Sequence, residues 1–164
     1  MSEVTALLEA NERFAASFDK GDLEIPPARG VLVLTCIDAR IDPAKALGLD
    51  IGDAHVVRNA GGRASDDAIR SALISSWLLG TREHVVIHHT DCGMQKFTDD
   101  ALLGKIREEK GVDLDGQSFL TFSDLEGSVR DDVAKLREHP GLPDGVSVSG
   151  YVYEVESGRL RPVE

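Results

Sequence analysis

Two hydrophobic patterns alternate along the chain, and they predict a sheet flanked by helices. Two short apolar runs rich in branched residues, at 31–35 and 84–88, indicate strands that are buried on both faces, as in a parallel sheet. Further strands are predicted at residues 55–57 and 146–155, and a return strand is predicted at 160–163. Pro162 confines the return strand to a sheet edge, because proline cannot donate a ladder hydrogen bond.

Apolar residues at helical spacing, together with residues that favour a helix start or end, predict helices before and between these strands. The predicted helices cover residues 3–19, 43–49, 65–79, 99–110 and 125–139. Strands that alternate with helices form right-handed βαβ units. We therefore expect an α/β fold: one domain over residues 1–164, with a central, mainly parallel β-sheet flanked by helices. The helix at 65–79 is apolar on more than one face, so we expect it to contact a second subunit as well as the sheet.

Charge and composition exclude several classes of function. The formal net charge of −11 disfavours binding to nucleic acid or to an anionic membrane surface. No apolar run approaches the ~20 residues needed to span a bilayer. Residues 1–20 carry three glutamates and no apolar signal core, so we predict a cytoplasmic protein. Its two cysteines then suit core packing or metal binding better than a disulfide.

Both cysteines lie in segments that follow predicted strands. Cys36 follows the first strand, and His89 and Cys92 follow the third. Ligands bind at the carboxyl ends of the strands in such sheets, so we expect these three side chains to converge if the two strands are neighbours. Two thiolates and one imidazole favour zinc, and three protein ligands leave a fourth position open, as in catalytic sites. The alternative for each cysteine is an ordinary place in the core.

Asp38 and Arg40 stand next to this predicted zinc site. Arg40 can hold Asp38 in a bidentate pair, which keeps the carboxylate ionised. Two roles stay open for Asp38: a fourth zinc ligand that closes the site, or an acceptor for a zinc-bound water. The pair can also be purely structural. A segment at the end of the second strand is predicted to form a pocket wall, and it includes Asn59, Ala60, Gly61 and Gly62.

These motifs resemble the β-class carbonic anhydrases, whose signatures are C-x-D-x-R and H-x-x-C. Here they read Cys36-Ile37-Asp38-Ala39-Arg40 and His89-Thr90-Asp91-Cys92, with the family's R-N-A-G segment at residues 58–61 between them. The resemblance covers residues 25–155, and it is to a short bacterial subgroup. It implies a Zn²⁺ lyase in which zinc-bound hydroxide hydrates CO₂ to bicarbonate, with Asp38 and Arg40 as the catalytic dyad. It also implies a homodimer that often pairs into a homotetramer.

Two other functions remain open. Members of this subgroup can hydrolyse carbonyl sulfide or carbon disulfide at the same zinc site, because these molecules are linear like CO₂. A non-catalytic zinc-binding module is the second alternative, in which Asp38 closes the site permanently. An intermediate case has Asp38 on the metal at low pH and released at higher pH.

Overall fold

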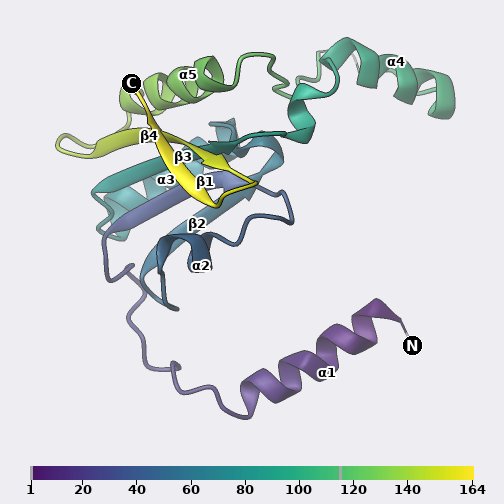
Figure 1. Cartoon of the computed structure of the whole chain (residues 1–164). Coiled ribbons are helices and arrows are strands. Elements are labelled where there is room, and N and C mark those ends of the chain that lie inside the picture. The colour runs from purple at the N-terminus through teal and green to yellow at the C-terminus, as the bar shows by residue number, and fades with distance from the viewer. Residues whose placement is uncertain (1, 115) are drawn as a thin grey trace.

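The computed structural model describes residues 2–114 and 116–164, and within them the strands form one five-stranded sheet in the order β2-β1-β3-β4-β5 (Figure 1). The strands are β1 (Val31–Cys36), β2 (Ala54–Asn59), β3 (Glu83–His89), β4 (Ser147–Glu154) and β5 (Arg159–Val163). The first four are parallel, and β5 pairs antiparallel with β4. The mainly parallel fold is confirmed, and the strand that carries Pro162 lies at the sheet edge as predicted.

Helices form where the pattern predicts them, with ends that differ by a few residues. They are α1 (Glu3–Ala15), α2 (Pro43–Leu47), α3 (Asp66–Leu78), α4 (Asp99–Lys110) and α5 (Leu125–Arg137), with single 3-10 turns η1 (Ala60–Gly62) and η2 (Gly93–Gln95). Side chains of Asp42, Ser65 and Thr98 accept hydrogen bonds from first-turn amides and fix three of the starts. α1 ends before residue 19, because the amides of Ser17 and Phe18 bond three residues back and tighten the chain into a turn.

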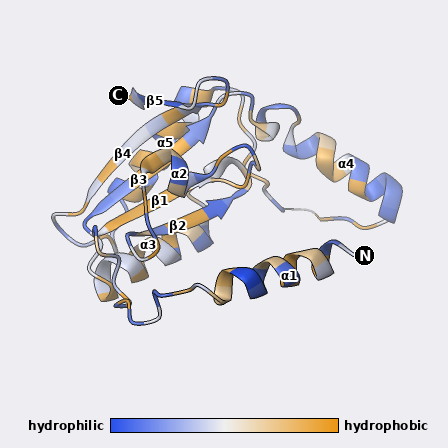
Figure 2. Cartoon of the chain, turned by 60° about the horizontal axis from the view of Figure 1, so that its bottom comes forward, coloured by the Kyte–Doolittle hydropathy of each residue, from blue (hydrophilic) through white to orange (hydrophobic). Residues whose placement is uncertain are grey.

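α3 and α5 pack on the same face of the sheet. Their inward residues, such as Ala72 and Val129, join strand residues such as Leu34 and Val86 in one core cluster. Figure 2 shows the hydrophobic residues of β1 inside the sheet. β1 and β3 are buried along most of their length, which explains why these two runs are continuously apolar and do not alternate. This core holds the carboxyl ends of β1 and β3 next to each other.

α1 and α4 extend away from the sheet in Figures 1 and 2, and neither has a buried residue. Several large apolar side chains of α1 are exposed, among them Leu7 at 68%. Trp77 and Leu78 at the end of α3 are also exposed, at 64% and 75%. In the parts of the chain that the structure describes, no helix combines the length and apolar character needed to cross a bilayer.

Candidate metal centre

The ends of two neighbouring strands bring three metal-ligating side chains together. Cys36 ends β1, His89 ends β3, and Cys92 begins the turn that follows. β1 and β3 are paired in parallel, so their carboxyl ends meet at the same edge, as the sequence predicts. The two sulfur atoms and a ring nitrogen of His89 all lie within 4.8 Å of one another, and all three residues are buried. This group could hold a metal ion.

The protonation and hydrogen bonding of the donor atoms in this cluster suit metal binding. His89 donates from Nδ1 to the carbonyl of Thr90 at 2.9 Å, which leaves Nε2 as the bare nitrogen. That Nε2 is buried and has no hydrogen-bond partner. The Cys92 thiol, with help from His89 and the amides of Asp38 and Gly61, lowers the pKa of Cys36 to about 4 although burial opposes this. A buried lone pair next to a thiolate is costly without a cation, so the donor set suits a soft metal.

Asp38 and Arg40 form the bidentate pair expected from their spacing. Arg40 donates from Nε to Asp38 Oδ1 at 3.0 Å and from Nη2 to Oδ2 at 2.8 Å, and its backbone amide also donates to Oδ1 at 2.9 Å. These bonds, above all those of the guanidinium, hold the pKa of Asp38 well below its usual range. Asp38 Oδ2 lies 3.7 Å from His89 Nε2. The ionised carboxylate therefore stands directly beside the three potential ligands.

The end of β2 supports this arrangement through its hydrogen bonds. Arg58 donates to the carbonyls of Cys36 and Asp38, at 2.9 and 2.8 Å, and fixes the turn that carries both. Asn59 uses its amide within its own segment, with bonds to the backbone of Arg63 in both directions.

The two glycines of this segment are buried under the ligands. The amide of Gly61 faces the Cys36 sulfur, and Gly62 packs against β1. Gly61 and Gly62 are buried and Ala60 is exposed, and the pocket-wall role of Asn59, Ala60, Gly61 and Gly62 stays a prediction.

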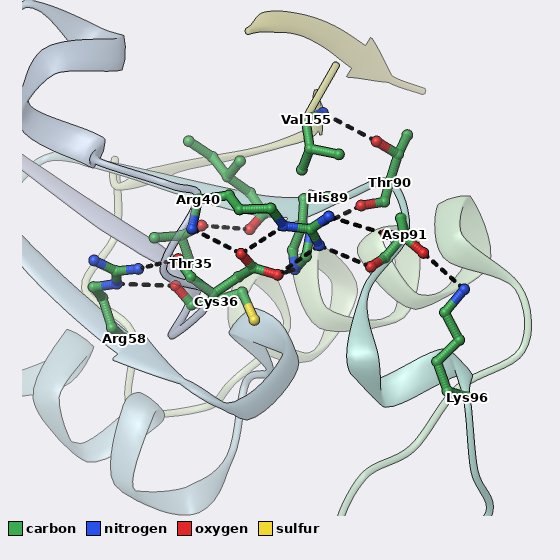
Figure 3. A network of polar contacts seen from close by, with 11 residues as sticks. Thr35, Cys36, Arg40, Arg58, His89, Thr90, Asp91, Lys96 and Val155 are labelled. Carbon is green, nitrogen blue, oxygen red and sulfur yellow. Dashed lines mark hydrogen bonds and ion pairs between the residues drawn. The ribbon is translucent and has the colours of Figure 1, made fainter. Parts of the chain in front are cut away.

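Two groups of ion pairs, one in the site and one behind it, were not predicted from the sequence. Asp91 forms an ion pair with Arg40, from Arg40 Nη1 to Asp91 Oδ2 at 2.9 Å, and a second with Lys96 at 2.7 Å (Figure 3). Behind the site, Arg63 and His88 both contact the buried Asp132. The position of Asp91 inside the H-x-x-C motif could have indicated a role in the site. Arg63 and Asp132 are 69 residues apart, and no local sequence pattern connects them.

Comparisons with known proteins agree with this geometry. The family model described as carbonic anhydrase matches residues 31–160. β-carbonic anhydrase 1 of Mycobacterium tuberculosis is 40% identical over 156 residues, which cover 95% of this chain and 94% of that protein. A carbon disulfide hydrolase of Saccharolobus solfataricus is 42% identical over 161 residues, covering 84% of this chain and 78% of that protein.

A solved structure extends the likeness to the whole fold. A carbonic anhydrase from Streptococcus mutans superposes with a TM-score of 0.95 at 44% identity, covering 100% of this chain and 99% of the other. The family match includes both strand ends that carry Cys36, His89 and Cys92. With this fold, this order of motifs and these identities, the chain belongs to the β-class carbonic anhydrase family.

Proposed function

We propose that this protein catalyses the reversible hydration of CO₂ to bicarbonate and a proton, with Zn²⁺ as its cofactor. The observation that carries the proposal is the position of Asp38. Its carboxylate is held by Arg40 beside the ligand cluster, at 3.7 Å from His89 Nε2, while only three soft ligands converge. A structural zinc site has four protein ligands, and a three-ligand site keeps one position for water or substrate.

In this proposal Cys36, His89 and Cys92 hold the zinc through two sulfur atoms and Nε2. When bound, the metal supplies a Lewis acid that brings the pKa of a water to about 7. Asp38 stays ionised and accepts a hydrogen bond, which orients the attacking oxygen. Arg40 fixes the carboxylate so that it does this in one orientation. Apolar side chains next to the cluster, including Met94 and Phe97, suit a small apolar substrate such as CO₂.

The test is zinc stoichiometry measured together with the CO₂ hydration rate by stopped flow, over roughly pH 6 to 9, a range around the zinc-water pKa. We expect zinc-loaded wild-type protein to hydrate CO₂ and Asp38→Asn to keep its zinc but lose about 10²- to 10⁴-fold in turnover, the usual contribution of a positioned proton acceptor. A fully loaded wild-type protein with no hydration at any of these pH values would identify a non-catalytic zinc module instead.

Hydrolysis of carbonyl sulfide or carbon disulfide is the second candidate. The observation in its favour is the 42% identity to a carbon disulfide hydrolase. The chain spans more of the M. tuberculosis carbonic anhydrase, 94%, than of the hydrolase, 78%, and this favours CO₂. Release of H₂S from each sulfur compound, measured beside CO₂ hydration on the same preparation, separates these activities. A faster rate on carbonyl sulfide or carbon disulfide than on CO₂ would make that hydrolysis the first candidate function.

We also propose that the protein acts as a homodimer or homotetramer in the cytoplasm. α1 has no buried residue in the single chain, although it carries several exposed apolar side chains. Trp77 and Leu78 add exposed apolar area at the end of α3. Apolar surface of this extent is typical of subunit interfaces.

A further inference from the structure

The guanidinium of Arg40 connects the two motifs that carry the potential metal ligands. One edge, Nε and Nη2, faces Asp38 with distances of 3.0 and 2.8 Å. The other end faces the H-x-x-C motif, where Nη1 reaches Asp91 Oδ2 at 2.9 Å and Nη2 reaches the Asp91 carbonyl at 3.0 Å (Figure 3). The orientation that Arg40 presents to Asp38 is therefore fixed from the opposite side by Asp91.

Asp91 is itself held firmly in place. Its backbone φ is +53°, a left-handed conformation that aspartate and asparagine tolerate better than most residues. The preceding residue, Thr90, donates its amide to the carbonyl of Tyr153 and accepts from the amide of Val155, so the turn is tied to the end of β4. Lys96 contacts the second carboxylate oxygen of Asp91 at 2.7 Å.

Without such an anchor the Arg40 side chain has considerable freedom. It is 47% exposed, and a long arginine side chain in solvent populates many rotamers. The bidentate grip on Asp38 depends on one of these rotamers. Asp38, in turn, stands close enough to the ligand cluster that a modest rotation would carry an oxygen toward the metal position.

We propose that Asp91 is a positioning residue: it orients Arg40 so that Asp38 stays beside the metal and not on it. This inference rests on the proposed zinc-dependent function and adds a determinant that acts through Arg40. Asp91 is the third residue of H-T-D-C, so the motif supplies two metal ligands together with the group that keeps the fourth position open.

The test uses the cobalt(II)-substituted protein and thiocyanate, a small anion that needs the open position. Asp91→Asn keeps the backbone carbonyl and the tolerance for positive φ but removes the carboxylate. We expect the thiocyanate Kd, measured from the visible absorption bands of cobalt, to rise about fivefold, because Asp38 then competes for the metal. The magnitude is that of one partly exposed ion pair.

The direction of the change is informative. Removal of a negative charge near the metal would by itself tighten anion binding, whereas loss of positioning weakens it. Asp67→Asn is the matched control, since it also removes one exposed, arginine-paired aspartate and lies outside the site. It should leave the Kd unchanged. Unchanged or tighter thiocyanate binding in Asp91→Asn would overturn the inference.

A double variant tests the route of the effect. In the Asp38→Asn background there is no carboxylate to compete, so Asp91→Asn should no longer weaken thiocyanate binding. The same fivefold loss in that background would mean that Asp91 acts on the metal site independently of Asp38, and the inference would be wrong. These measurements do not depend on CO₂ turnover, so a protein that fails to hydrate CO₂ can still pass or fail them.

Discussion

His88 and His89 are neighbours in β3, and each has 0% of its side chain exposed, yet their surroundings differ completely. His88 points to α5, where Nδ1 pairs with Ser128 and Nε2 lies 3.2 Å from both the Gly62 carbonyl and Asp132. His89 points to the cysteines, and its Nε2 has no partner. His88 belongs to a network in which its ring nitrogens have partners, which we call the closed cluster. His89 has an unpaired ring nitrogen next to two cysteine sulfurs, which we call the open cluster.

The two clusters show how buried polar groups of structure and of function can be distinguished. Around Asp132, Arg63 donates from Nε at 2.6 Å and His88 adds a second contact; although burial opposes ionisation, these bonds keep the pKa of Asp132 below its ordinary value. Such a network is complete without any further group. The cluster of Cys36, His89 and Cys92 leaves Nε2 of His89 without a partner, and a bound cation would satisfy it.

The largest effect is expected when the open cluster loses a ligand. Cys92→Ser replaces a soft thiolate by a hydroxyl that seldom binds zinc, so zinc content should fall from about one per chain to near zero. Hydration should disappear with the metal. Metal analysis after dialysis, with circular dichroism as a check on folding, measures this. Retention of a full equivalent of zinc would mean that Cys92 is not a ligand.

The closed cluster should respond in stability and not in metal content. Asp132→Asn leaves the Arg63 guanidinium without its counter-charge in a buried place, and breaking a buried pair of this kind costs about 3–5 kcal/mol of the free energy of unfolding. Urea unfolding of the zinc-loaded protein gives the value. Glu126→Gln, which breaks the exposed pairs with Arg130 and Arg161, is the control and should leave the free energy of unfolding almost unchanged. Equal costs would contradict the distinction between buried and exposed pairs.

A third histidine of β3, His84, extends the comparison, and its substitution is expected to have the smallest effect on stability. His84 also has a buried nitrogen without a partner, Nδ1, and its Nε2 pairs with Ser76. Within the described residues it belongs to no group that could hold a metal ion. Burial lowers its pKa from 6.5 to about 4. Between these two pKa values the unfolded chain binds more protons than the folded chain. His84 therefore makes the free energy of unfolding rise as the pH increases from about 4 to 6.5, and this contribution is lost as the pH falls through the same range.

His84→Gln keeps a hydrogen-bonding group but cannot gain the proton. We expect the wild type to lose about 1–2 kcal/mol more of its free energy of unfolding than the variant between pH 7 and pH 5. Urea unfolding at both pH values, with metal content held equal, checks it. Parallel pH dependence of the two proteins would show that His84 is not the group responsible.

Much of the fold and of the cluster follows from the sequence, because local pattern and sheet geometry suffice for both. Continuous apolar runs predict β1 and β3, and the carboxyl-end rule places Cys36 and His89 at the same edge. The assumption that β1 and β3 are neighbours is confirmed by their pairing. The position of His88 on the opposite face of β3 also follows from the alternation of side chains along a strand.

The remaining contacts depend on tertiary structure that no local pattern contains. The pair of Arg63 and Asp132 forms only when α5 is packed on the sheet. The contact of Asp91 with Arg40 depends on a left-handed residue whose conformation is set by the anchoring of its turn to β4. The glycines at 61 and 62 predict a close approach of the backbone, but they do not tell which segment approaches; Gly62 lies against the ends of β1 and β3.

Gly62 limits how far the metal site can vary. A β-carbon there would lie 2.9 Å from the backbone carbon of Thr35 and 3.0 Å from both the amide of Cys36 and the carbonyl of Ile87. The chain has φ +69° at this point, and no side chain fits between the strand ends. Even a methyl group would therefore force the ends of β1 and β3 to shift, and these are the strands that end in Cys36 and His89. A substitution at a residue that offers no side chain to the cluster would in this way disturb its geometry.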